Sequence, residues 1–192
     1  MLKIGIITGS TRPNRKSLKI AKELKEWADK REDAEYEIVD IAAYHLPMYN
    51  EPIAALYSQD YQTPEAIPWA EKIASLDAFI FVVPEYNHGL PSALKNAIDY
   101  LCHEYGNKVA GTVTYGSQGG LRAGEVLRLV LGGLHVAVIS TSLSLSILTD
   151  FDSEENFTPT EIHEGIFNKL LDRLLAWGEP LKVLRENKRT HK

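Results

Sequence analysis

Cysteine is almost absent from this sequence, since Cys102 is the one cysteine in 192 residues. A single cysteine cannot form a disulfide within the chain, which fits a reducing compartment. The sequence also lacks an apolar run of the roughly 20 residues that a membrane-spanning helix needs. Its first ten residues, MLKIGIITGS, have the pattern of a strand followed by a glycine turn, unlike a signal peptide. These absences predict a cytoplasmic protein with no membrane segment.

The sequence also lacks an excess of basic residues. It has 21 Lys and Arg against 26 Asp and Glu, which gives a net charge of -5. A protein that binds nucleic acid needs a basic face for the phosphates, so we expect no nucleic-acid partner. The basic run at 181–192 is interpreted as a solvated C-terminal tail, with a binding arm as the alternative. The six histidines lack the paired spacing of a metal site, so no metal is expected.

The residues that are present indicate one ordinary globular domain. Hydrophobic residues make up 44% and charged residues 24% of the chain, and no linker, repeat or low-complexity run divides it. Short apolar segments predict strands at 2–8, 35–41, 78–83, 108–115 and 135–140. Several are apolar almost throughout, which is typical of parallel strands covered by helices on both faces. We expect an α/β three-layer sandwich, with a single domain at 1–180.

Helical patterns separate these strands. Apolar stripes predict one helix from residue 17, a second over 90–101, and a third that starts near Ile162 and is ended by Gly178 and Pro180. Weaker patterns predict helices at 64–76 and 120–131. In such a fold the ligand lies beyond the carboxyl ends of the strands, so the loops after the first, third and fourth strands are the candidate site.

The first of these loops, GSTRPNRKS at 9–17, has features of an anion site. It matches neither the P-loop nor the dinucleotide-binding spacing. Its hydroxyls and Arg12 lead into a helix N-terminus, which would suit a terminal monophosphate. The alternative makes Ser17 a simple N-cap and leaves Arg12, Arg15 and Lys16 as solvated charges.

The other two loops add a family resemblance. PEYNHGLPSALKNAIDYL at 84–101 combines an aromatic, an amide and an imidazole, and GSQGGLRA follows the fourth strand. Together with the first loop, they resemble the NAD(P)H-dependent FMN reductases of flavodoxin-like fold, which include soluble quinone, azo-dye and chromate reductases. The resemblance covers nearly the whole chain. It implies a five-stranded parallel sheet in the order 2-1-3-4-5, FMN as cofactor, and NADPH or NADH as electron donor.

The resemblance also implies roles for individual residues. The FMN phosphate would be held by Ser10, Arg12 and Ser17, with the amides around Lys16 and Leu18. The ribityl chain and one edge of the ring would be lined by Pro84, Glu85, Tyr86, Asn87 and His88, and the pyrimidine side by Ser117 and Gly119. His88 departs from the family, where many members have a small or aromatic residue. No catalytic side chain is expected, because FMN carries the chemistry.

The same resemblance implies a homodimer, or a tetramer, with residues 46–52 reaching the partner's flavin. The apolar loop at 44–57 fits this role, unless it folds back on its own sheet. The acceptor would be a small molecule: a quinone, an azo dye, a free flavin or a metal oxyanion.

Two other function classes remain as alternatives. One is a non-enzymatic FMN-binding electron carrier or redox sensor. The other is a hydrolase, because Ser117, Asp150 and His163 follow one another in the order of the α/β hydrolases. Tyr115 stands where the hydrolase pattern requires a glycine.

Overall fold

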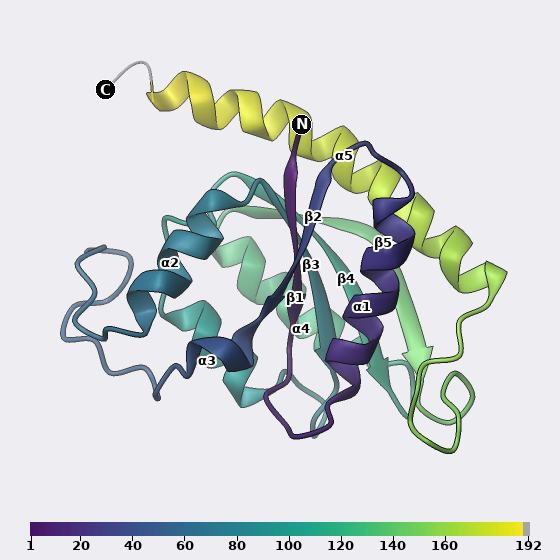
Figure 1. The fold of residues 1–192 in the computed structure, drawn as a ribbon. Helices are drawn as coiled ribbons and strands as arrows, with labels where there is room; N and C mark the ends of the chain where they lie inside the picture. Colours follow the sequence, from purple (N-terminus) through teal and green to yellow (C-terminus); the bar gives the residue numbers. More distant parts are fainter. Residues whose placement is uncertain (190–192) are drawn as a thin grey trace.

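The five apolar segments form one parallel sheet in the computed structural model, which describes residues 1–189 (Figure 1). The strands are β1 (Lys3–Thr8), β2 (Glu35–Asp40), β3 (Ala78–Pro84), β4 (Lys108–Gly116) and β5 (Val136–Ser146). Their order is β2-β1-β3-β4-β5 and every neighbouring pair is parallel. The prediction of a parallel α/β sandwich in the order 2-1-3-4-5 is therefore confirmed.

Helices cover both faces of the sheet. They are α1 (Lys16–Asp29), α2 (Ala66–Ser75), α3 (Ser92–Asp99), α4 (Leu121–Gly133) and α5 (Glu161–Arg189), with a short 3-10 helix, η1 (Ile41–Tyr44), after β2. Residues of α1 and α5 share one hydrophobic core with the sheet, and residues of α2, α3 and α4 share the other (Figure 1). Every residue of β3 is buried because helices pack on both of its faces.

β5 is longer, and α3 shorter, than the sequence predicts. β5 continues to Ser146, six residues past its expected end at 140. Residues 141–146 alternate hydroxyl side chains with Leu143 and Leu145, and both leucines are buried in the core. α3 covers 92–99, and the flanking Leu90 and Leu101 lie outside the helix. A tight turn at 86–89 precedes α3, and the helix ends at Asp99. The helix is therefore shorter than the apolar stripe over 90–101 suggests.

The prediction that the last helix ends at Gly178 and Pro180 is wrong, since α5 continues to Arg189 with Pro180 inside it. Gly178 packs closely on the residue before β1: a Cβ there would lie 2.6 Å from Leu2 Cδ1, so the Leu2 side chain would have to shift. Lys182 Nζ lies 2.9 Å from Asp77 Oδ2, so the interpretation of 181–192 as a solvated tail is wrong at this residue. Residues 190–192 of that segment lie outside the described residues. The single-domain boundary at 1–180 stays a prediction.

The sheet topology sets the position of the candidate site. β1 pairs with β2 on one side and β3 on the other, so the strand order reverses at β1. The loops that follow β1, β3 and β4 leave the sheet from the same carboxyl edge, where open α/β sheets bind ligands. None of the described helices combines the length and apolarity needed to span a bilayer.

Candidate functional site

The β1–α1 loop, residues 9–15, lies close against β3. The Gly9 amide donates to the Val82 carbonyl at 2.8 Å, and a Cβ on Gly9 would lie 2.8 Å from the same oxygen. Only a glycine permits this approach. Further along, Asn14 turns the chain with a left-handed φ of 53°. The loop therefore brings the start of α1 to the carboxyl edge of the sheet.

The first turn of α1 has a buried polar group that the described residues leave unsatisfied. The N-cap residue is Arg15, and its side chain makes no capping hydrogen bond. Ser17 lies inside the helix rather than at the cap, it is fully buried, and its hydroxyl makes no hydrogen bond of ordinary geometry, although it lies near enough to the Tyr115 phenol to lower that group's pKa. The alternative of Ser17 as N-cap is therefore wrong. Because helix N-termini attract anions and buried hydroxyls are normally satisfied, this turn has the features of an anion site.

The three cations of the loop have different surroundings. The Arg15 guanidinium forms an ion pair with Asp40 at the end of β2, and the Thr8 hydroxyl donates to the same carboxylate at 2.8 Å. Lys16 Nζ lies 2.7 Å from Glu155 Oε1. The alternative of solvated charges is therefore wrong for Arg15 and Lys16. Arg12 is exposed, and its guanidinium carbon lies 5.9 Å from the centroid of the Tyr86 ring.

The β3–α3 loop begins with a tight turn at 86–89. The amides of Tyr86 and Gly89 donate to each other's carbonyls, and Asn87 and His88 between them have left-handed φ values of 50° and 65°. This double bond with two left-handed central residues is typical of a type I′ turn. The Tyr86 hydroxyl lies 2.9 Å from Ser10 Oγ, so a hydrogen bond joins the turn to the β1–α1 loop.

The β4–α4 loop, residues 117–120, folds back on the end of β4. Thr114 Oγ1 donates to the Gly119 carbonyl at 2.6 Å, and Gly119 and Gly120 have left-handed φ values of 74° and 70°. A Cβ on Gly120 would lie 2.7 Å from the backbone of Tyr115. Both glycines are needed for this sharp return of the chain into α4.

Glu85 connects the second and third loops. Its carboxylate accepts from the Arg122 guanidinium at 2.6 Å and from the Arg122 amide at 3.1 Å. Burial alone would raise the pKa of Glu85, but these hydrogen bonds from Arg122 outweigh it and lower the pKa. Glu85 is therefore ionised and joins the β3–α3 loop to the first turn of α4.

A pocket of about 520 Å³ lies between these loops and the segment after β5. Five of the twelve expected site residues line it: Arg12, Lys16, Pro84, Glu85 and Tyr86. Seven others do not belong to its lining: Ser10, Ser17, Leu18, Asn87, His88, Ser117 and Gly119. Ser10 and Ser17 are buried, and Leu18 is half-buried on α1. Asn87, His88 and Ser117 are exposed, and Gly119 lies partly exposed behind Thr114.

Sequence reasoning missed several residues of this pocket. Arg15, Tyr115, Ile147 and Glu155 line it together with Pro13, Asn14 and Gly116. Tyr115 is the next-to-last residue of β4, and an aromatic ring in a buried strand suggests core packing. Burial raises the pKa of Tyr115 above its ordinary value, with a partial offset from the neighbouring Ser17, so the phenol is protonated at neutral pH. Ile147 and Glu155 come from a segment with no motif of its own.

The geometry does not support the hydrolase alternative. His163 Nε2 lies 3.8 Å from Asp150 Oδ2, and His163 Nδ1 accepts from the Thr160 amide at 3.1 Å. Both ring nitrogens therefore face groups other than Ser117. A Ser-His-Asp triad requires one ring nitrogen to accept from the serine hydroxyl.

Comparisons with known proteins agree with this architecture. A sequence model described as NADPH-dependent FMN reductase matches residues 2–150. An NAD(P)H-dependent FMN reductase of Schizosaccharomyces pombe is 38% identical over 185 residues, which cover 96% of this chain and 88% of the relative. A quinone reductase of Escherichia coli K12 is 33% identical over 137 residues, or 65% of this chain and 71% of the relative.

A solved structure shows the same fold. The flavoenzyme NAD(P)H:acceptor oxidoreductase FerB of Paracoccus denitrificans superposes with a TM-score of 0.72 at 20% sequence identity. The alignment covers 94% of this chain and 98% of FerB.

Proposed function

The chain belongs to the NADPH-dependent FMN reductase family, and we propose that it is an oxidoreductase that binds FMN at the pocket described above. In this proposal NADPH or NADH supplies the electrons, and a small molecule accepts them. The observation that carries the proposal is the fully buried hydroxyl of Ser17, which makes no hydrogen bond of ordinary geometry and follows directly after Lys16 on the pocket wall. A phosphate accepts hydrogen bonds from hydroxyl and amide donors, which fits the donors of this turn.

The β1–α1 loop supplies the groups that would bind this phosphate. Ser17 donates its hydroxyl, the amides near Lys16 and Leu18 donate from the helix start, and the exposed Arg12 offers a guanidinium. Arg15 pairs with Asp40 through Nη2, which holds the loop against β2 so that the helix start keeps its position. Its buried Nε has no partner among the described residues and is a further donor beside the pocket.

The β3–α3 turn would orient the flat part of the cofactor. Tyr86 is fixed by its hydrogen bond to Ser10, and Pro84 and Glu85 place main-chain groups on the pocket wall. The Glu85 carboxylate is already occupied by Arg122, which keeps its negative charge from repelling an electron-rich ring. Bound FMN would supply the redox chemistry, accepting a hydride and returning two electrons to an acceptor. Asn87, His88, Ser117 and Gly119 would lie along the outer edge of this ring site.

We further propose that the acceptor is a quinone. The support is the quinone reductase of E. coli, which is 33% identical to this chain. Azo dyes, free flavins and metal oxyanions are the other acceptor classes that the same open site would admit.

The single free cysteine supports a reducing, cytoplasmic location.

Homodimer formation is also part of the proposal. Within the 44–57 loop, Tyr44 and Tyr49 fold back on the core against Trp69 and Tyr100. Leu56 and Tyr57 remain exposed. An apolar groove of about 440 Å³ lies beside them, lined by residues of this loop and by Ile98, Leu101, Cys102, Val130 and Leu134 near α3 and α4. A second copy of the chain would cover this surface, as large exposed apolar patches usually are covered.

Steady-state kinetics separate the enzyme from a non-enzymatic carrier. We expect the apoprotein to oxidise NADPH in the presence of a benzoquinone only after FMN is added. A protein that binds FMN but does not accelerate NADPH oxidation with any acceptor would be a carrier or sensor. A protein that does not bind FMN would overturn the proposal.

A further inference from the structure

The segment at 151–157, here called the acidic loop, is a compact turn that packs on the start of α1. Phe151 and Phe157 form an isolated bridge at its base. Within it, the Asp152 carboxylate accepts from the amides of Glu154 and Asn156 at 2.9 and 2.8 Å. These bonds fix the loop's shape independently of any ligand.

Lysines of α1 hold the acidic loop in place. Lys19 Nζ donates to the carbonyls of Glu154 and Glu155 at 3.2 and 3.3 Å and to Asn156 Oδ1 at 2.9 Å. Lys16 Nζ lies 5.4 Å from the centroid of the Phe151 ring. The contact with Lys19 uses main-chain oxygens and Asn156, so the Glu155 side chain is not needed to anchor the loop.

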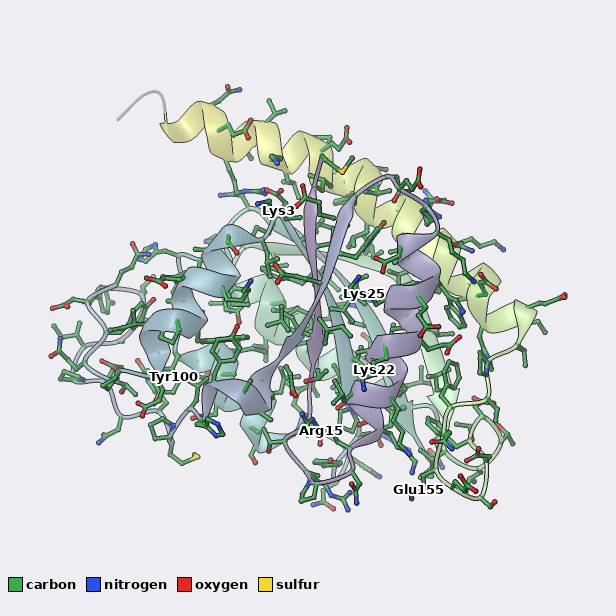
Figure 2. All side chains as sticks on the ribbon, in the orientation of Figure 1. Lys3, Arg15, Lys22, Lys25, Tyr100 and Glu155 are labelled. Atoms are coloured by element: carbon green, nitrogen blue, oxygen red, sulfur yellow. The ribbon has the colours of Figure 1, made fainter. Side chains whose placement is uncertain are left out.

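The Glu155 side chain instead faces the cationic end of the candidate pocket. Figure 2 shows Glu155 on the loop beside the start of α1. Its Oε1 lies 2.7 Å from Lys16 Nζ, and Arg12, Lys16 and Glu155 all line the pocket. The Lys16 side chain is 15% exposed and that of Glu155 is 66% exposed. The Glu155 carboxylate is therefore the member of the ion pair that can move into solvent. The hydrogen bond from Lys16 lowers the pKa of Glu155, which is therefore ionised at neutral pH.

We infer that Glu155 is an internal competitor for the ligand's phosphate, a carboxylate that occupies Lys16 until a phosphate displaces it. The inference rests on the proposed function, because it assumes that a phosphate binds at the β1–α1 loop. Two anions cannot share Lys16 and Arg12 without repulsion. Glu155 therefore reduces the affinity of the pocket for phosphorylated flavin and leaves the affinity for an uncharged flavin unchanged.

The test compares two isosteric variants of the full-length apoprotein. Glu155→Gln should bind FMN about three- to tenfold more tightly than the parent, since the displaced ion pair is largely exposed and contributes little by itself. Riboflavin, which has no phosphate, should bind both proteins equally. Glu154→Gln changes the net charge by the same amount one residue away, and no contact ties its carboxylate to Lys16, so it should leave both affinities unchanged. Inorganic phosphate should compete with FMN more effectively in Glu155→Gln.

The dissociation constants, measured by flavin fluorescence at one salt concentration, distinguish the outcomes. If Glu155→Gln binds FMN with unchanged or weaker affinity while the parent binds it well, the competitor role is wrong and the proposed function stands. If Glu154→Gln tightens FMN binding equally, net charge rather than the contact with Lys16 is responsible, and the inference is also wrong. If the parent binds no FMN, both the inference and the proposed function fail.

Discussion

At the scale of single residues, Arg12 and Arg15 illustrate how surroundings decide the role of a side chain. They lie three positions apart in one loop, and the sequence alone does not distinguish them. In the structure Arg15, labelled in Figure 2, is paired with Asp40. Arg12, in contrast, is exposed over the Tyr86 ring. Arg12 is therefore the guanidinium that we expect to bind the phosphate.

Substitution of Arg12 tests this role. A hydrogen bond to a charged group contributes about 1.5–3 kcal/mol, so Arg12→Ala should weaken FMN binding roughly ten- to a hundredfold. Riboflavin affinity should change by less than about threefold, because the β3–α3 turn is untouched. Both dissociation constants should be measured on the same apoprotein at one salt concentration, since ions screen the contact. Equal weakening of both ligands would mean that Arg12 supports the fold or the ring site.

At the scale of elements, the strands and most helices could be predicted from the sequence because their pattern is local. The apolar run of β3 predicted a strand buried on both faces, and the stripe of Ile20, Leu24 and Trp27 predicted α1. The end of α5 could not be predicted. Gly178 and Pro180 resemble a helix stop in the sequence. In the structure Gly178 instead packs inside the helix against Leu2, which is 176 positions away in the sequence.

The site was predictable to a similar extent. The loops after β1 and β3 have recognisable motifs, and both contribute to the pocket. Glu155 could not be predicted, because its contact with Lys16 depends on how the chain after β5 packs on α1. Exposure of Asn87 and His88 follows from the tight turn at 86–89, which the sequence of the loop did not reveal.

Two glycines of α5 give a matched test of helix packing. A Cβ on Gly178 would lie 2.6 Å from Leu2 Cδ1, whereas a Cβ on Gly165 would meet nothing within 4 Å. Gly165→Ala should raise the free energy of unfolding by up to about 1 kcal/mol, since alanine favours the helix. Gly178→Ala should be less stable than Gly165→Ala by about 1 kcal/mol, at the low end of overpacking costs, because the end of the Leu2 side chain must shift away from the new methyl group. Urea unfolding measures both, and equal stabilities would mean that Leu2 makes room for the methyl group without cost.

Asp77 fastens the second half of α5 to the sheet. Burial alone would raise its pKa, but the Lys3 amide and the Lys182 and Arg185 cations outweigh burial and lower the pKa. A group with a lowered folded-state pKa stabilises the protein above its unfolded pKa of about 3.9, and this stabilisation is lost as the pH falls through the folded value. Asp77→Asn should therefore lower the free energy of unfolding by about 1–3 kcal/mol at pH 7.

The pH dependence of this difference is the check. Urea unfolding of the parent and Asp77→Asn should give stabilities that differ fully above about pH 5, begin to converge near the unfolded pKa of about 3.9 and converge further as the pH falls through the lowered folded-state pKa. A difference that stays constant well below the unfolded pKa would mean that the ionised carboxylate does not hold α5.

At the scale of the whole molecule, the exposed apolar side chains predict the oligomeric state. Leu129 on α4 is 79% exposed and lies on the element that borders the apolar groove, whereas Ile162 on α5 is 72% exposed on the other helical layer. If the chain forms the proposed dimer through this groove, Leu129→Glu should be a monomer at micromolar concentration, because an unpaired charge at an interface is costly. Ile162→Glu should remain dimeric. Light scattering that finds the FMN-loaded parent to be a monomer would remove the dimer proposal.

The claim that this protein carries electrons from NAD(P)H through FMN is tested most directly by one anaerobic spectrum. The apoprotein is saturated with FMN, freed of excess flavin and mixed with NADPH, and the visible flavin band is followed. The account predicts that a bound-flavin band is present, bleaches when NADPH is added and returns when a benzoquinone is added. A protein that retains no FMN, or a bound band that neither NADPH nor NADH bleaches, would contradict it.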